Sequence, residues 1–159
     1  MSLQKRAGAL QFAAVLCAAL AMAACAKNPA EDLGAATPGS QQDFTVNVGD
    51  RVFFESDSSE LTSVAQATLD KQARWLQQYS RYNFVLEGHA DERGTREYNF
   101  ALGARRAESV KQYLAARGIA ASRMRTISYG KERPVAVCND ISCWSQNRRV
   151  VTVLGGGQS

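Results

Sequence analysis

The strand-and-loop pattern of this chain is clearest in Phe84-Val85-Leu86-Glu87-Gly88-His89-Ala90-Asp91-Glu92-Arg93-Gly94. Its first residues form an apolar run that is typical of a buried strand, and the rest is polar with glycine at the end. Polar residues that follow a strand directly lie at the end of a sheet, where ligands commonly bind. A helix is predicted next, from Arg96 to Arg117, because Gly118 suits the left-handed position after a helix end.

Strands and helices alternate on either side of this stretch. Residues 52–54 form a short apolar run after a turn signal, and residues 124–129 and 149–154 are also typical of strands. Apolar residues recur at helical spacing over residues 61–79, which predicts an amphipathic helix of about 17 residues. We therefore expect a βαβαβ(α)β fold of the α/β class, an α+β sandwich with helices packed on one four-stranded sheet.

Length and composition limit the class of protein. The chain has 159 residues, enough for one domain, with 45% hydrophobic and 21% charged residues, which are ordinary values for a globular protein. A disordered chain, a collagen-like chain and a multi-span membrane protein are therefore excluded. Without Lys5 and Arg6 the 19 basic residues become 17 against 15 acidic ones, a net charge of +2. So mild a balance gives no reason to expect a nucleic acid partner.

Residues 1–24 have the layout of a secretory signal peptide. Two basic residues precede an apolar run that ends at Ala24, and this run is shorter than the roughly 20 residues of a membrane-spanning helix. The ending Met22-Ala23-Ala24-Cys25 resembles a bacterial lipobox, whose cysteine is lipidated and becomes the new N-terminus. We expect Cys25 to carry fatty acyl chains, palmitate among them, that anchor the protein without spanning the membrane. The alternative is an ordinary signal peptide cut near Ala24.

The remaining chain divides into a linker, a domain and a tail. Residues 25–42 comprise the predicted lipidated N-terminus at Cys25 and a stretch of mostly small and polar residues, which we expect to be a flexible linker. The domain is predicted to cover residues 43–155, with a tail at residues 156–159. Ala26 and Lys27 include no aspartate of the kind linked to retention in the inner membrane, which favours the outer membrane.

The predicted helix at residues 96–117 carries an arginine on its apolar side. Arg106 and Asn99 fall within the apolar stripe, and a buried guanidinium is costly unless it is paired. One interpretation is an internal ion pair with Asp91 or Glu87. The other is a guanidinium held for a carboxylate ligand, beside an Asp91 carboxylate that suits an ammonium group. In that case the two residues would form a receptor for a zwitterionic amino-acid head.

Several ordered motifs resemble the peptidoglycan-associated lipoprotein (Pal) family, whose domains are OmpA-like. These motifs are Gly88-His89-Ala90-Asp91-Glu92-Arg93-Gly94-Thr95, Glu97-Tyr98-Asn99, Leu102-Gly103-Ala104-Arg105-Arg106-Ala107, Ser128-Tyr129-Gly130-Lys131-Glu132 and Asn147-Arg148-Arg149. The resemblance extends from about Val52 to Leu154, and the lipobox and linker agree with it. It implies a peptidoglycan-binding domain with helices packed on a four-stranded mixed sheet.

The resemblance also implies a ligand and its binding residues. The family binds the meso-diaminopimelate side chain of the peptidoglycan stem peptide, which carries an ammonium and a carboxylate on one carbon. By resemblance, Asp91 takes the ammonium and Arg106 takes the carboxylate, while Asn99 and Leu102 line the wall. Asp57 occupies the family's first-loop position, although the chain departs from the family pattern on either side of it.

His89, Cys138 and Cys143 invite comparison with a zinc site, which needs histidine or thiolate ligands at suitable spacing. The chain has His-Ala-Asp where a zinc deaminase has His-x-Glu, and four residues separate the cysteines, so we expect no metal. We expect instead a Cys138–Cys143 disulfide, as befits an exported protein. His89 is predicted to position Asp91 by a hydrogen bond, with Arg93 and Arg148 as orienting or structural residues.

The predicted function is that of a binding protein with no cofactor apart from its lipid. The resemblance implies an outer-membrane lipoprotein whose periplasmic domain grips peptidoglycan without a covalent bond and ties the envelope layers together. It further implies the Tol–Pal system, with TolB as a partner that competes for an overlapping surface, and a part in envelope constriction at division. The alternatives are a lipid-anchored cell-wall hydrolase or amidase, a flagellar stator domain, and a scaffold in which Arg106 is bridged internally.

Overall fold

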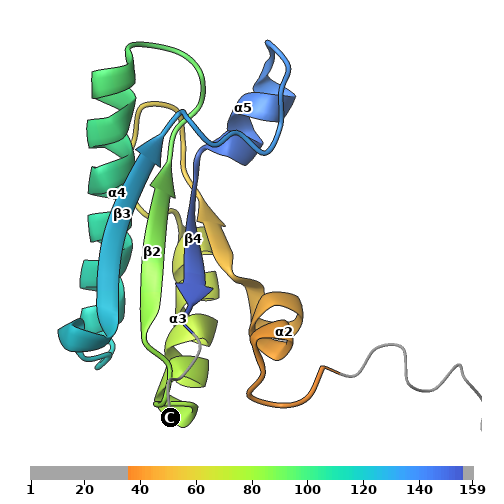
Figure 1. Ribbon diagram of the computed structural model, residues 1–159, viewed down its shortest axis with the longest axis vertical. Coiled ribbons are helices and arrows are strands. Elements are labelled where there is room, and N and C mark those ends of the chain that lie inside the picture. Colours follow the sequence, from red (N-terminus) through yellow and green to blue (C-terminus); the bar gives the residue numbers. More distant parts are fainter. Residues whose placement is uncertain (1–35, 156–159) are drawn as a thin grey trace, which may run out of the picture. The chain divides into compact units, whose positions relative to one another are not determined.

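The computed structural model describes residues 36–155, which form a sheet covered on one face by two long helices (Figure 1). The predicted signal peptide, the lipidation site Cys25, most of the predicted linker and the predicted tail at residues 156–159 lie outside the described residues. Among the described helices, none is long and apolar enough to cross a membrane.

The sheet has four strands in the order β1-β4-β2-β3. The strands are β1 (Arg51–Phe53), β2 (Phe84–His89), β3 (Met124–Gly130) and β4 (Arg149–Leu154). β2 and β3 are parallel, as expected for strands joined through a helix, whereas β4 runs antiparallel to both β1 and β2. The mixed α+β sheet predicted for this chain is therefore confirmed.

Helices α3 (Ser63–Gln78) and α4 (Arg96–Ala116) cover the sheet. Thr62 and Thr95 cap their N-termini, each accepting a hydrogen bond from a backbone N–H of the first turn. Both helices were predicted to within about two residues, and Gly118 has the positive φ of 87° expected after the end of α4. The core lies between these helices and the sheet and includes Leu69, Leu76, Leu86, Val110, Leu114 and Val150.

The described residues also form three shorter helices, α2 (Gln41–Asp43), the π-helix η1 (Phe44–Gly49) and α5 (Ile141–Asn147). A single-turn 3₁₀ helix, η2 (Ala121–Arg123), leads into β3. α5 corresponds to the optional helix of the predicted fold and stands at the upper end of β4 in Figure 1. The π-helix was not predicted, because no periodic pattern distinguishes it from a turn.

The fold begins earlier than the predicted boundary at residue 43. The carbonyl oxygen of Gly39 accepts hydrogen bonds from Tyr82 Oη at 2.7 Å and from Arg81 Nη2 at 2.6 Å. Asp43 accepts a further bond from Trp75 Nε1 at 2.8 Å. Residues 36–42 were assigned to the linker from their composition, but a backbone carbonyl can be a partner in the fold whatever side chain it carries.

Two glycines allow α4 to approach β2 closely. A Cβ atom at Gly88 would overlap the carbonyl group of Gly103, and one at Gly103 would overlap the Ser128 side chain. The absence of side chains at this crossing lets the helix backbone lie against the strand backbone. α4 is thereby placed so that its polar residues reach the loops at the end of the sheet.

Candidate ligand-binding site

A pocket of about 450 Å³ lies between the loop after β1, the loop after β2 and the first turns of α4. Its lining residues are Ser56, Asp57, Asp91, Arg93, Gly94, Tyr98, Asn99 and Leu102. Four of the five residues predicted from the sequence are therefore brought together: Asp57, Asp91, Asn99 and Leu102. The fifth, Arg106, is not among the lining residues.

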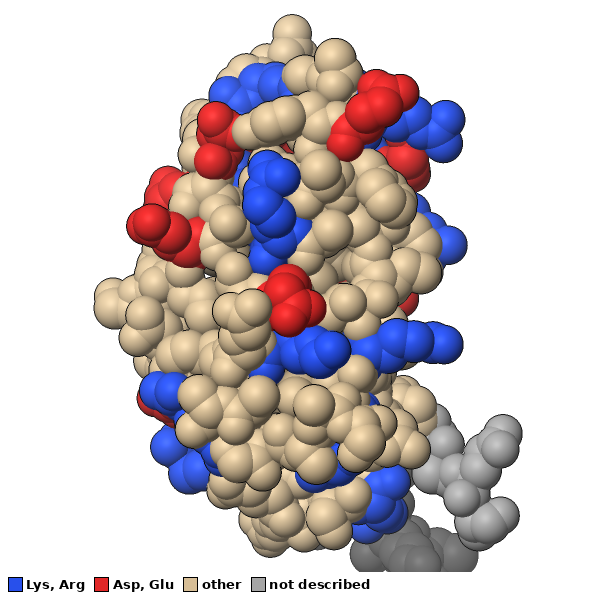
Figure 2. Space-filling view, turned by 90° about the vertical axis from the view of Figure 1, so that its left-hand side faces the viewer, with Lys and Arg blue, Asp and Glu red and all other residues tan. Residues whose placement is uncertain are grey.

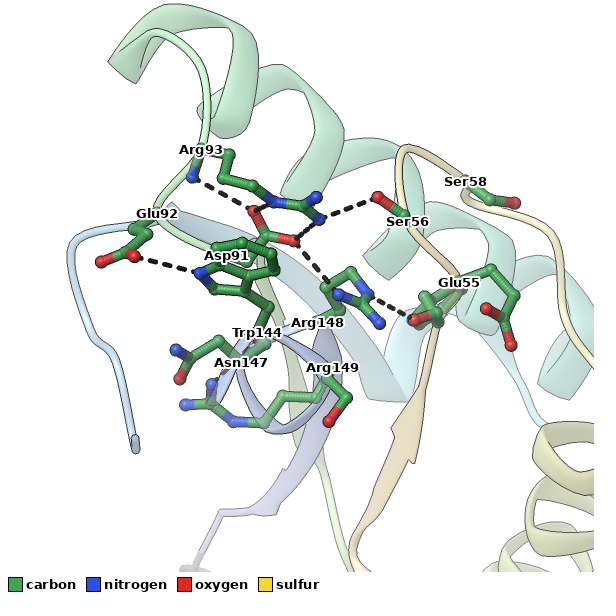
Figure 3. A network of polar contacts seen from close by, with 12 residues as sticks. Glu55, Ser56, Ser58, Asp91, Glu92, Arg93, Trp144, Asn147, Arg148 and Arg149 are labelled. Carbon is green, nitrogen blue, oxygen red and sulfur yellow. Dashed lines mark hydrogen bonds and ion pairs between the residues drawn. The ribbon is translucent and has the colours of Figure 1, made fainter. Parts of the chain in front are cut away.

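Asp91 is the centre of a charged cluster in this pocket (Figure 3). Its Oδ1 accepts hydrogen bonds from the backbone N–H and the Nε of Arg93, at 3.1 and 3.0 Å. Its Oδ2 accepts from Arg93 Nη2 at 2.7 Å and from Arg148 Nη1 at 3.3 Å. Burial alone would raise the pKa of Asp91, but these hydrogen bonds outweigh it, so the pKa lies below the usual range. Asp91 is therefore a buried carboxylate that stays ionised.

Arg106 has no exposed surface and binds backbone carbonyl groups. Its Nε donates to Ser58 O at 2.8 Å, and its Nη2 donates to Glu55 O at 3.0 Å. Its Nη1 donates to His89 O at 2.9 Å, and the guanidinium lies 5.2 Å from the Phe54 ring centre. Arg106 therefore ties the loop after β1 to the end of β2, which fixes two walls of the pocket from behind.

The internal ion pair considered for Arg106 is wrong for the described residues. Within residues 36–155 no carboxylate oxygen lies within ion-pair distance of Arg106. Burial, reinforced by the nearby charge of Arg148, lowers its pKa to about 10, which still leaves it protonated near neutral pH. Carbonyl dipoles stabilise the buried charge in place of a carboxylate.

The remaining predicted residues shape the pocket in different ways. Asp57 has a φ of 56°, which is uncommon for a residue with a side chain, and its carboxylate accepts a hydrogen bond from Tyr98 Oη. Asn99 Nδ2 donates to Arg93 O at 2.7 Å and so holds the loop after β2 against α4. Leu102, which is 5% exposed, contributes apolar surface to the wall.

His89 does not position Asp91 by a side-chain hydrogen bond, so that prediction was wrong. It is 2% exposed, and neither ring nitrogen has a hydrogen-bond partner among the described residues. The ring packs beside Tyr129, with 5.6 Å between ring centres. His89 contributes to the site through its carbonyl oxygen, which binds Arg106, because it is the last residue of β2.

Cys138 and Cys143 form the predicted disulfide, with 5.6 Å between their Cα atoms. A disulfide leaves no thiolate to bind zinc, so these cysteines and His89 cannot make the zinc site considered above.

Trp144, which follows Cys143 in the chain, was not predicted to take part in the site. Its Nε1 donates to Glu92 Oε1 at 3.0 Å, and the Arg93 guanidinium lies 4.2 Å from its ring centre. The sequence feature that indicated a role for Trp144 was its position directly after Cys143, because a disulfide restrains the residues next to it.

Charged side chains of both signs lie on the face of the molecule that Figure 2 shows. The face shown in Figure 2 carries basic and acidic side chains interspersed among uncharged ones, with no single basic patch. This arrangement agrees with the mild net charge and gives no basis for nucleic acid binding on that face.

A two-layer α+β domain with a charged pocket at one end of its sheet is the architecture of a ligand-binding module. The model of the OmpA family matches residues 53–148. A peptidoglycan-associated lipoprotein from Rhizobium meliloti is 63% identical over 157 residues, covering 94% of this chain and 89% of the relative. One from Brucella melitensis is 62% identical over 154 residues, covering 91% and 92% of the two chains.

Solved structures agree with these relatives. The crystal structure of the peptidoglycan-associated lipoprotein from Burkholderia pseudomallei has a TM-score of 0.68 and 36% identity, covering 72% of this chain and 98% of that one. The C-terminal domain of Helicobacter pylori MotB, at 22% identity, shares the fold with a TM-score of 0.63 over 67% of this chain and 84% of its own. The chain therefore belongs to the OmpA family, and within it to the peptidoglycan-associated lipoproteins. This membership makes it a binding protein and not an enzyme, which sets aside the hydrolase and amidase alternative.

Proposed function

We propose that this protein is an outer-membrane lipoprotein that binds peptidoglycan non-covalently through the pocket and tethers the membrane to the cell wall. The observation that carries the proposal is the buried and ionised Asp91 carboxylate at the pocket. An ionised carboxylate at a pocket open to solvent suits a cationic group of a ligand, which would replace one of its arginine partners. The two relatives described above are named peptidoglycan-associated lipoproteins, and this name supplies the polymer on which that group would be found.

The ligand group we propose is the side chain of meso-diaminopimelate in the stem peptide. Its ammonium would bind Asp91, while Asn99 and Leu102 would contact the carbon chain from the wall of the pocket. The predicted contact between Arg106 and the ligand carboxylate has less support, because Arg106 is fully buried and donates to three carbonyl groups. We assign Arg106 a supporting role behind the pocket.

The proposed tethering role depends on the predicted lipid anchor and on the repeating structure of peptidoglycan. A lipid on Cys25 would hold many copies on one membrane, facing a polymer with many identical stem peptides. Weak individual contacts then add up through effective concentration, so the link is strong overall and each contact still exchanges. We extend the proposal to the Tol–Pal system, in which TolB would compete for a surface overlapping the pocket, and to envelope constriction at division.

The proposal is tested by sedimenting a soluble fragment that starts at Ala26 with purified sacculi. Wild type should pellet, and excess diaminopimelate should return it to the supernatant. Asp91→Asn keeps the shape of the side chain but removes its charge, so the affinity should fall about tenfold or more. Glu108→Gln makes the same change of charge at an exposed position of α4 and should bind as wild type does.

Circular dichroism of each variant establishes that it is folded before binding is compared. Wild type that stays in the supernatant would contradict peptidoglycan binding. A folded Asp91→Asn variant that pellets as well as wild type would contradict the assignment of the pocket.

A further inference from the structure

β1 lies at one edge of the sheet, and its inner side is paired with β4 (Figure 1). The carbonyl oxygen of Asp50 accepts a hydrogen bond from the Thr152 N–H at 2.7 Å, and the Phe54 N–H donates to the carbonyl oxygen of Arg148 at 3.0 Å. In an antiparallel ladder every second residue bonds to the partner strand, so residues 50, 52 and 54 are the ones that turn their main-chain groups toward β4.

The main-chain groups of Arg51 and Phe53 therefore point away from β4. Within residues 36–155, no hydrogen bond satisfies these groups on the outer side of the strand. Unpaired N–H and C=O groups at a sheet edge are a template for another extended chain, because an extended backbone presents acceptors and donors at the matching spacing. The edge of β1 thus indicates the chemical nature of a partner, which is a further strand.

A hollow of about 600 Å³ adjoins this edge. Residues of α3 and α5 contribute to its walls, so the edge of β1 lies in a groove. Phe53 on the strand is 47% exposed, and Val64 in the first turn of α3 is 75% exposed, so the groove offers apolar surface to the side chains of an added strand. A groove with helices in its walls admits a single extended segment more readily than the sheet edge of a second copy of the chain.

Opposite charges stand at the two ends of the segment of residues 51–55 that lines the groove. Arg51 begins this segment and Glu55 ends it. The Arg51 side chain is 42% exposed and pairs with its neighbour Asp50, while the exposed Glu55 has no ion-pair partner among the described residues. An antiparallel strand that runs past Glu55 first and Arg51 last would therefore carry a basic residue at its start and an acidic residue at its end.

We propose that an extended segment of a partner protein binds along β1 as a fifth strand, antiparallel to it. Its pattern is one basic residue, three apolar residues and one acidic residue. The terminal charges pair with Glu55 and Arg51, the central residue packs on Phe53, and the other two apolar residues face Val64. Main-chain hydrogen bonds supply the affinity, and the side chains fix the register. The groove shares no lining residue with the ligand pocket, so the inference does not depend on the proposed function.

The test measures the fluorescence anisotropy of a labelled peptide, acetyl-Lys-Val-Tyr-Val-Glu-amide, with the fragment from Ala26. Wild type should bind this peptide about fivefold or more tightly than the peptide with Lys and Glu exchanged, because two exposed ion pairs become two repulsive contacts. Arg51→Glu with Glu55→Lys should reverse the preference. Arg96→Glu with Glu108→Lys makes the same exchange of charges at exposed positions of α4, and this control should keep the wild-type preference.

N-methylation of the peptide separates strand pairing from nonspecific apolar contact. In the proposed register the tyrosine N–H donates to the carbonyl oxygen of Phe53, whereas the N–H groups of both valines point away from β1. Methylation of the tyrosine nitrogen should therefore weaken binding about tenfold or more, and methylation of the first valine nitrogen should weaken it by about twofold or less. Equal losses for the two peptides would overturn the proposal.

Amide hydrogen exchange measured by NMR locates the bound peptide. The outward N–H groups of Arg51 and Phe53 should exchange fast in the free protein and more slowly in the complex. A wild type that does not bind the peptide, that binds both charge orders alike, or whose Phe53 amide stays unprotected in the complex would overturn the proposal. So would a Phe53 amide that is protected in the concentrated protein alone and exposed on dilution, because a second copy of the chain would then be the occupant of the groove.

Discussion

Arg106 and His89 meet at the backbone carbonyl of His89, and each has a buried side chain that makes no hydrogen bond to a carboxylate of the described residues. Arg106 donates hydrogen bonds to two carbonyl groups of the loop after β1 and to one at the end of β2, and so holds these two parts of the site together. The His89 ring is enclosed near Tyr129, with Glu87 Oε2 at 4.0 Å from its Nε2. Neither residue lines the pocket, yet both hold the end of β2 that leads to Asp91.

The burial of His89 predicts a pH-dependent stability. Burial first, and then the charges of Arg149 and Arg133, lower its pKa from 6.5 to about 4. As the pH falls below about 6.5, the unfolded chain takes up a proton that the folded protein does not. The free energy of unfolding should therefore fall between about pH 6.5 and pH 4, by up to about 3 kcal/mol, and this contribution should level off below.

Urea unfolding of the fragment from Ala26 across this pH range measures the effect. His89→Phe has no proton to take up, so its stability should decline less than that of wild type over the same interval. Equal declines for the two proteins would assign the pH dependence to carboxylates and not to His89.

At the scale of elements, α5 is the short helix that determines how the charged cluster is held. Its N-cap Asp140 lies inside the loop that the disulfide closes, and Trp144 follows one residue after that loop. Asn147 at its end accepts hydrogen bonds from the backbone N–H groups of Val135 and Ala136, at 2.8 and 3.2 Å. The disulfide and the Asn147 hydrogen bonds thus join both ends of α5 to the segment after β3. These links hold the helix in place although it has only seven residues.

Removal of the disulfide should destabilise the domain. A closed loop this small restricts the unfolded chain by about 2 kcal/mol, so Cys138→Ser with Cys143→Ser should lower the free energy of unfolding by about that amount. Dithiothreitol should lower the stability of the wild-type fragment from Ala26 equally and leave the double variant unchanged. A wild type whose urea midpoint is insensitive to dithiothreitol would contradict a stabilising disulfide.

At the scale of the whole described domain, the segment before β1 is part of the fold. Gly39 and Asp43 are bound by residues near the end of α3 and just beyond it, which lie some 32 to 43 positions later in the chain. Phe44 packs against Trp75, with 4.9 Å between ring centres. The described segment therefore begins at the end of the sheet away from the pocket, where α2 lies in Figure 1.

Truncation measures the contribution of this segment. A fragment that starts at Phe44 lacks Gly39 and Asp43, and it should melt about 4–8 °C below a fragment that starts at Ala36. Tyr82→Phe, which removes the hydroxyl bound to Gly39, should destabilise the longer fragment by about 1 kcal/mol and the shorter one hardly at all. Equal melting temperatures for the two fragments would show that the segment adds nothing to stability.

The amino-acid sequence by itself determined the four strands, the two long helices and the family. Strands and long helices follow from local periodicity, and their ends follow from residues such as Thr95 and Gly118, so they could be predicted within a residue or two. The disulfide was predicted from two nearby cysteines in a chain with a predicted export signal. The pocket residues Asp57, Asp91, Asn99 and Leu102 came from motifs that resemble a known family.

Only the tertiary structure decided which polar groups meet. The partners of Arg106 lie 17, 48 and 51 positions away, and those of Trp144 and Arg148 in the charged cluster lie 52 and 57 positions away. No local pattern encodes such pairings, because a guanidinium can donate hydrogen bonds either to a carboxylate or to carbonyl oxygens. The choice between them depends on where the folded backbone leaves its carbonyl groups, and that position is set by the packing of α4 on β2.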